Sequence, residues 1–205
     1  MPLIEVEGMH HDDVYKLLVG SVVPRPIAWL TTIDPENGRV NAAPFSCYTF
    51  CCSSPPMVGV TVGRGRVKDS TRNARNEGSF VLNVVNEDMI EPMHLSSTDF
   101  PPEISEPEHF NIELAPSKFI RTPRVKAAPI SLECKLHEII AFGDKDGSDF
   151  IVGQVIAFHI NDDLYENGRI NMKKLKPLAR LGGPVYARLG EHITMPSVGP
   201  STTAR

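Results

Sequence analysis

Short runs of apolar and β-branched residues, separated by turn residues, dominate this chain and predict strands. These runs cover residues 27–33, 40–52, 57–62, 79–85, 130–142 and 150–160. The two longest flank a turn at 143–147, which contains two glycines and two aspartates, so they predict an antiparallel hairpin. A Pro and an Asn-Gly pair within 34–38 predict another hairpin between the first two runs. We expect the strand 40–52 to have an edge or a bulge at Pro44, because proline cannot donate to a ladder.

Helical signals are few. Residues 71–77 predict about two helical turns, with Asp69 or Ser70 as the N-terminal cap and Gly78 just beyond the C-terminus. Asn86 could open another short helix, which Pro92 would disrupt after about a turn. The stretch 95–128 is rich in proline and has no periodicity. A segment of that length without regular structure predicts a functional loop or lid.

The pattern as a whole predicts a mainly β protein: an all-β barrel with a few peripheral helices, although a sandwich fits the same pattern. The 205 residues are enough for one substantial core. We therefore expect a single domain over 1–190. The remainder, 191–205, has little periodicity and is expected to be a mobile tail unless a partner subunit holds it.

Charge, the length of the apolar runs and cysteine spacing argue against several classes of protein. A net charge of −4 argues against a nucleic-acid surface, which is normally basic. The apolar runs are too short to span a membrane, and no export signal is visible, so the cytosol is the expected location. The cysteines Cys47, Cys51, Cys52 and Cys134 lack zinc-site spacing and are expected to be reduced thiols; no metal is expected.

Two segments could hold a phosphorylated ligand. Residues 41–54 carry many small and hydroxyl side chains for a strand, among them Ser46 and Thr49, and a ligand rich in acceptors would satisfy them. The second segment is Lys68-Asp69-Ser70-Thr71, which gathers a lysine, two hydroxyls and backbone N–H groups at a helix start. Asp69 would compete with an anion unless it only caps the helix. A solvated edge strand and an unliganded helix cap explain the same residues.

No Ser-His-Asp arrangement and no paired carboxylates are legible, so no catalytic side chain is assigned. The basic cluster Arg64, Arg66, Lys68, Arg72 and Arg75 fits either a solvated helix face or an anion site. If the protein is an enzyme, we expect a cofactor to supply the chemistry.

Several segments, in order and spacing, resemble the flavin reductase-like, FMN-binding split-barrel family, which includes the flavoredoxins. The similarity lies in 24–32 (PRPIAWLTT), 38–46 (GRVNAAPFS), 54–58 (SPPMV), 68–73 (KDSTRN), 78–83 (GSFVLN), 132–134 (LEC), 153–155 (GQV) and 180–186 (RLGGPVY). Together these segments cover most of the chain between residues 17 and 190.

The resemblance implies a Greek-key split β-barrel that forms a homodimer with FMN near the subunit interface. It also implies an oxidoreductase that passes electrons from NADH or NADPH to flavin or to a downstream acceptor. The residues that match flavin-contacting positions are Trp29, Ser46, Thr49, Cys52, Lys68, Asp69, Ser70, Thr71 and Tyr186. A flavoredoxin-type electron carrier reduced by a protein partner, and a cofactor-free β-barrel that binds another ligand, remain as alternatives.

Overall fold

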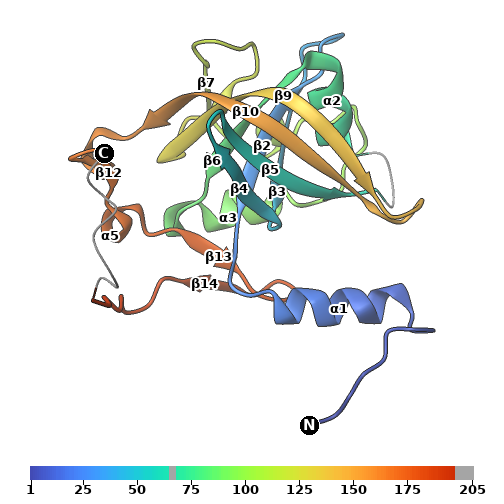
Figure 1. Cartoon of the computed structure of the whole chain (residues 1–205). Coiled ribbons are helices and arrows are strands. Elements are labelled where there is room, and N and C mark those ends of the chain that lie inside the picture. Colours follow the sequence, from blue (N-terminus) through green and yellow to red (C-terminus); the bar gives the residue numbers. More distant parts are fainter. Residues whose placement is uncertain (65–67, 197–205) are drawn as a thin grey trace.

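The computed structural model describes residues 1–64 and 68–196. Arg66 of the basic cluster and most of the expected tail therefore lie outside the described residues. One twisted antiparallel sheet of seven strands forms the body of the protein (Figure 1), in the order β3-β2-β6-β9-β10-β5-β4. Its strands are β2 (Ala28–Ile33), β3 (Val40–Phe45), β4 (Tyr48–Ser53), β5 (Pro56–Gly63), β6 (Ser79–Val84), β9 (Ile130–Phe142) and β10 (Ser148–Ile160).

The sheet stays open. Strands β3 and β4 are consecutive along the chain but lie at opposite edges, and no ladder joins them within the described residues. The segment that links them is held to β5, where the N–H of Thr61 donates to the carbonyl of Cys47 at 2.8 Å. The mainly β fold is thus confirmed, and the barrel is split between its two edge strands.

The predicted hairpins and most strand positions are confirmed. Strands β9 and β10 pair across the turn at 143–147, and β2 pairs with β3 across the turn at 34–38. The expectation of a single strand over 40–52 was wrong. The chain leaves the sheet after Phe45 and re-enters at the other edge with Tyr48, while Pro44 lies inside edge strand β3, where no donor is needed on the open side.

Helix α2 (Asp69–Glu77) packs on β2, and the left-handed residue Gly78, with φ at 71°, ends it as predicted. Its N-cap, however, is Lys68 rather than Asp69 or Ser70, and no side chain caps it. Pro92 does not break the next helix. It lies in the first turn of α3 (Ile90–Leu95), where no intrahelical N–H bond is required.

The stretch 95–128 is folded against the barrel rather than structureless. It contains the short helix α4 (Glu106–His109) and a two-stranded sheet of β7 (Leu114–Ala115) and β8 (Arg124–Val125). Its buried carboxylate Glu106 accepts from the N–H of Ala42 in β3 at 3.1 Å. This bond satisfies a backbone donor on the open edge of the sheet and fixes α4 against β3.

A smaller sheet extends below the barrel (Figure 1) and consists of β1 (Arg25–Pro26), β13 (Leu178–Arg180) and β14 (Tyr186–Arg188). Helix α1 (His11–Ser21) lies beside this sheet, outside the barrel, and buries none of its side chains. The remaining elements are η1 (Glu87–Met89), η2 (Asp162–Leu164), β11 (Tyr165–Glu166), β12 (Arg169–Ile170) and α5 (Met172–Leu175). No helix among residues 1–64 and 68–196 is long and apolar enough to cross a membrane.

The core divides into two clusters. The larger fills the barrel, with Phe80, Leu82 and Ile151 fully enclosed. The smaller one, built around Trp29 and Met93, lies between β2 and the helices that follow β6. The two clusters hold the sheet, α2 and the 95–128 segment in fixed positions, and these three surround the hollow described next.

Candidate functional site

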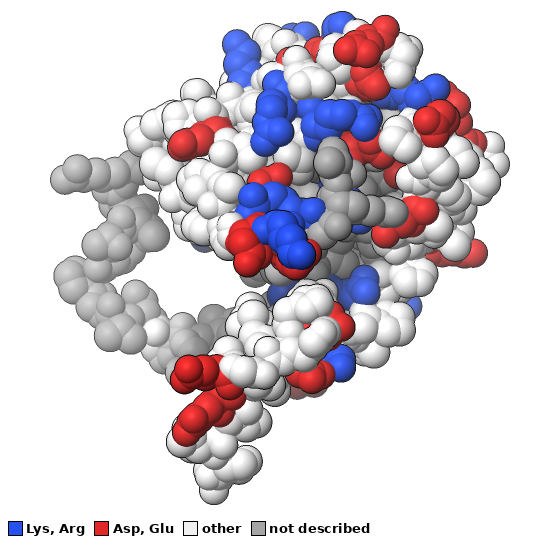
Figure 2. Space-filling view, turned by 90° about the vertical axis from the view of Figure 1, so that its right-hand side faces the viewer, with Lys and Arg blue, Asp and Glu red and all other residues white. Residues whose placement is uncertain are grey.

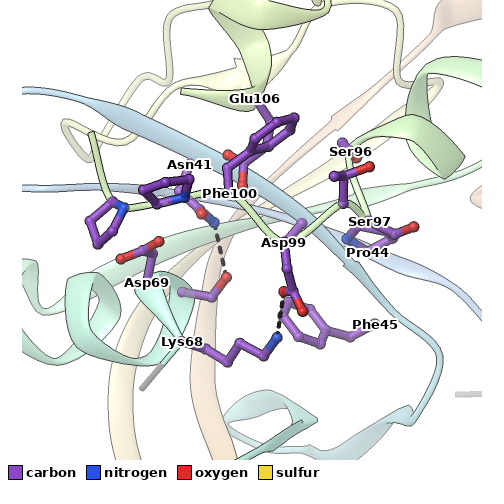
Figure 3. Close-up of a pocket in the computed structure, with 15 residues that line it drawn as sticks. Asn41, Pro44, Phe45, Lys68, Asp69, Ser96, Ser97, Asp99, Phe100 and Glu106 are labelled. Atoms are coloured by element: carbon purple, nitrogen blue, oxygen red, sulfur yellow. Dashed lines mark hydrogen bonds and ion pairs between the residues drawn. The ribbon is translucent and has the colours of Figure 1, made fainter. Parts of the chain in front are cut away.

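A hollow of about 410 Å³ opens beside the start of α2 (Figure 3), within the size range of small-molecule sites. We call it the α2 hollow. Strand β3 forms its floor, Lys68 and the first turn of α2 form one side, and residues 96–102 form the other. Three segments that are far apart in sequence therefore meet here, and the loop expected from the 95–128 stretch supplies one wall.

The first turn of α2 presents hydrogen-bond donors that meet no acceptor among residues 1–64 and 68–196. The N–H groups of Asp69, Ser70 and Thr71 precede the first intrahelical bond, which runs from the N–H of Arg72 to the carbonyl of Lys68 at 3.1 Å. Because no side chain caps this helix, an acceptor from a ligand can take these donors. The nine-residue helix also directs the positive end of its dipole to the same point.

Side chains around this turn are held in place. The amide of Asn41, on the floor of the hollow, donates to the hydroxyl of Ser70 at 2.9 Å, and both residues are buried (Figure 3). The ammonium of Lys68 lies 2.7 Å from the carboxylate of Asp99 on the facing wall. Asp69 is paired with Arg72, whose guanidinium lies 2.7 Å from its carboxylate. Asp69 thus neutralises an arginine and does not cap the helix.

Glu106 adds a titratable group to the rear wall. Burial is the main reason that the pKa of this carboxyl is raised, and the nearby Asp69 carboxylate raises it further, although the N–H of Ala42 acts in the opposite direction. The α2 hollow therefore contains one lysine and three acidic side chains. Any anion bound here must rely on the helix start and on Lys68 released from Asp99.

A second hollow of about 410 Å³ adjoins the first, and the two share Pro44, Phe45 and Ser97. We call it the arginine hollow, because Arg25 and Arg180 line it together with Ser46, Thr61 and Tyr15. The Nε of Arg25 donates to the hydroxyl of Ser46 at 3.3 Å. The two hollows therefore adjoin around the end of β3, and we call them together the trough.

The structure brings some of the predicted site residues together and not others. Lys68, Asp69 and Ser70 line the α2 hollow, and Ser46 lines the arginine hollow. Thr71 is buried one position further along α2. Thr49 and Cys52 lie exposed on edge strand β4, and they line neither hollow.

Trp29 and Tyr186 line neither hollow. Trp29 is fully enclosed in the smaller core cluster, and its indole N–H meets no acceptor among the described residues. The hydroxyl of Tyr186 accepts from Arg180 at 2.7 Å and lies 2.8 Å from Nδ1 of His94. Burial raises the pKa of Tyr186, while the charge of Arg180 lowers it. Tyr186 therefore holds Arg180 in position at the edge of the arginine hollow.

Sequence reasoning missed Arg25, Asp99, Glu106 and Arg180. The sequence already held one signal for Asp99, a lone acidic residue just before Phe100 and two prolines, but nothing paired it with a lysine 31 residues earlier. The roles of Arg25 and Glu106 depend on tertiary contacts with other segments. Figure 2 shows that basic and acidic side chains are interspersed on the face of the molecule that lies on the right-hand side of Figure 1.

Comparison with known proteins adds to this geometry. The model of the "Flavin reductase like domain" family matches residues 19–179. Nitrilotriacetate monooxygenase component B from Bacillus cereus is 38% identical, with a TM-score of 0.92, covering 95% of this chain and 98% of that one. The 2-nitrobenzoate 2-nitroreductase NbaA of Pseudomonas fluorescens is 35% identical, with a TM-score of 0.87 and coverages of 98% and 100%.

A Shewanella frigidimarina structure with a split barrel domain shares the fold at 19% identity. Its TM-score is 0.83, and the match covers 93% of this chain and 95% of that one. This likeness agrees with the open seven-stranded sheet. The family match spans the sheet, α2, the α2 hollow and most of the arginine hollow, so this chain belongs to the flavin reductase like family, as its sequence indicated.

Proposed function

We propose that this chain binds FMN with its phosphate at the start of α2 and its ring along the wall that the two hollows share. The observation that carries the proposal is the uncapped first turn of α2 beside Lys68, because it combines three N–H groups without an acceptor in the described part of the chain, a helix dipole and a cation. Ser70, held by Asn41, supplies a hydroxyl donor at the same point. The family match supports flavin as the ligand.

The remainder of the trough suits a planar ring. Pro44 and Phe45 form an apolar wall that both hollows share, and Ser46 offers a hydroxyl at its end. The structural relatives include FMN-binding proteins and flavoredoxins, which supports FMN over a ligand of another class. Thr49, Cys52, Trp29 and Tyr186 stay predicted contacts. The first two lie on β4, so they would reach the ring only where β4 meets the trough.

We further propose that the protein is an oxidoreductase that accepts electrons from NADH or NADPH and passes them to flavin or to a downstream acceptor. Bound FMN would supply the electron transfer, and the chain would bind, orient and shield it. Relatives in the comparison include a monooxygenase component B and an NADH:FAD oxidoreductase. The domain would be the single unit 1–190.

A homodimer is part of the proposal. Strand β4 is an open edge, and Phe50 on it is 77% exposed, which is unusual for a large aromatic side chain. Helix α1 exposes Tyr15, Leu17 and Leu18 as well. A second copy pairing over β4 and α1 would cover these residues and bring β4 of one subunit close to the trough of the other.

An anaerobic titration tests the activity. Purified protein is loaded with FMN, unbound flavin is removed, and the flavin absorbance is followed as NADH or NADPH is added. We expect one nicotinamide to bleach the absorbance. A protein that binds FMN but is reduced only by dithionite would instead act as a flavoredoxin-type carrier. A protein that retains no FMN would refute the proposal.

A further inference from the structure

The two hollows differ in charge, although they share a wall. The α2 hollow contains Lys68 with three carboxylates, whereas the residues lining the arginine hollow include Arg25 and Arg180 and no acidic side chain among the described residues. One end of the trough is therefore close to neutral or acidic, and the other end carries two permanent positive charges. Arginine stays protonated at all physiological pH values, so these charges persist.

Arg25 is a buried cation without an acidic partner in the described part of the chain. Its exposed fraction is only 5%. Its guanidinium donates to the carbonyls of Val19, Val22 and Leu181 and to the hydroxyl of Ser46, all of which are neutral acceptors. The α1 carbonyls contribute the partial negative end of a helix dipole, which offsets a fraction of one charge. A buried charge offset only in part favours a nearby anion.

Arg180 is the cation that can reach a ligand. Its Nε donates to the carbonyl of Gly183 at 2.6 Å, and its Nη1 donates to the hydroxyl of Tyr186 at 2.7 Å. The guanidinium also stacks 4.7 Å from the centre of the Tyr186 ring, so the side chain is held in one position. No described residue accepts from Nη2. One edge of a fixed guanidinium is thus available to an oxygen pair of a ligand.

The surroundings suit an anion attached to a flat ring. The aromatic side chain of Tyr15 lines one side of the arginine hollow, and Phe45 and Pro44 line the wall shared with the α2 hollow. The hydroxyls of Thr61 and Ser148 lie in the same lining and can donate to oxygen atoms. A ligand held here would have its ring on the Tyr15 side of the arginine hollow, facing the flavin ring on the shared wall in the proposed arrangement.

We infer that the arginine hollow binds the anionic group of the second substrate, with Arg180 as the direct contact and Arg25 as a fixed positive charge behind it. This inference rests on the proposed function, which places the flavin phosphate at α2. The substrate class is a planar compound that carries a carboxylate or a phosphate. Two sources fit this chemistry: an aromatic carboxylate, and the pyrophosphate of a nicotinamide dinucleotide.

The first experiment uses the full chain without flavin. Binding of 4-fluorobenzoate and of the neutral 4-fluorobenzamide is measured by fluorine NMR line broadening. Arg180→Gln removes the charge, Arg180→Lys retains it, and Arg188→Gln removes an exposed arginine from the neighbouring strand β14 as a matched control. We expect Arg180→Gln to weaken 4-fluorobenzoate binding by about tenfold or more, as for a lost charged hydrogen bond. Arg180→Lys should restore part of the 4-fluorobenzoate binding. The affinity for 4-fluorobenzamide should be the same in every variant.

The second experiment distinguishes the dinucleotide. FMN-loaded protein is reduced either by NADH or by the uncharged analogue N-benzyl-1,4-dihydronicotinamide. A loss in kcat/KM for NADH alone in Arg180→Gln identifies the pyrophosphate as the anion. The inference would be overturned if Arg180→Gln left both the 4-fluorobenzoate affinity and kcat/KM for NADH unchanged. Equal losses of affinity or kcat/KM for the charged and the neutral ligands would also overturn it. FMN and riboflavin affinities of each variant are measured in parallel. If Arg180→Gln selectively loses FMN, the hollow holds the flavin phosphate instead, and the inference fails.

Discussion

The ammonium of Lys68 lies 2.7 Å from the carboxylate of Asp99, which is 31 residues further along the chain and on the opposite wall of the α2 hollow. Both side chains are partly exposed, so their attraction is screened and is worth at most about 1 kcal/mol. The pair is therefore weak enough for a phosphate to separate. A phosphate at the start of α2 would compete with Asp99 for the same ammonium.

This competition gives a prediction. Asp99→Asn removes a negative charge from the hollow and releases Lys68, so FMN should bind about two- to fivefold more tightly, and the gain should shrink at high salt. Fluorescence titration with FMN measures the change. Asp146→Asn, in the exposed turn between β9 and β10, is the matched control and should change nothing. Weaker FMN binding by Asp99→Asn would mean that Asp99 contributes to the site.

A second prediction concerns the buried carboxylate Glu133 in β9, which is fully enclosed. Burial opposes its ionisation, but the N–H groups of Lys118 and Phe119 and the ring of His159, 2.6 Å away, outweigh burial and lower the pKa of Glu133. Glu133→Gln leaves one of these donors facing an amide NH₂. We expect the free energy of unfolding to fall by about 3 kcal/mol at neutral pH, as measured by urea denaturation.

The pH dependence of this loss has a defined sign. Because the pKa of Glu133 is lower in the folded state than in the unfolded chain, ionised Glu133 stabilises the fold above its ordinary pKa of 4.5. This contribution disappears as the pH falls through the lower, folded-state value. The difference between Glu133→Gln and the unsubstituted chain should therefore narrow in acid, and a difference that widened in acid would contradict this assignment.

Packing at Gly153 in β10 gives a third prediction. A Cβ built there would lie 2.4 Å from the ring of Phe80, a fully buried core residue, and 3.0 Å from Cβ of Cys134. Gly153→Ala should therefore destabilise the protein by about 1–3 kcal/mol through overpacking. The control is Gly182→Ala, because a Cβ at Gly182 meets nothing within 4 Å. Thermal unfolding of the two variants compares them directly, and equal melting temperatures would argue against the packing described.

The proposed homodimer gives a fourth prediction. Phe50 projects from edge strand β4 and is 77% exposed in the single chain. Phe50→Asp should shift the protein from dimer to monomer in sedimentation or light-scattering measurements, since an interface would then bury an unpaired charge. Lys135→Asp, an exposed substitution on β9, is the control. A chain that is monomeric without any substitution would disprove the homodimer.

Particular elements show what the sequence could and could not predict. The hairpin of β9 and β10 follows from two long apolar runs around a glycine-containing turn, and Gly78 ends α2 because glycine tolerates its positive φ. Local signals decide both features. The break after Phe45 was missed, because nothing local distinguishes a strand that bends from one that crosses to the opposite edge of the sheet.

The candidate site likewise contains residues that the sequence predicted and residues that it did not. Lys68 and Ser70 were predicted because a lysine and hydroxyls at a helix start have local meaning. Arg25 and Asp99 acquire their roles from residues 21 to 156 positions away, and the sequence carries no signal for such pairings. Arg180 is held by the nearby Gly183 and Tyr186, but only the fold brings it to the arginine hollow. Trp29 was predicted beside the flavin, yet its burial in the smaller core cluster shows that it also serves packing.

The most direct test of the central claim compares FMN with riboflavin, which differ only in the phosphate. In Lys68→Ala/Ser70→Ala, FMN affinity should fall by about tenfold or more, because charge-assisted and hydroxyl bonds to the phosphate are lost, while riboflavin affinity stays within about twofold. Lys173→Ala, an exposed lysine in α5, should leave both affinities unchanged. Equal losses for FMN and riboflavin, in a variant that is still folded, would contradict a phosphate site at the start of α2.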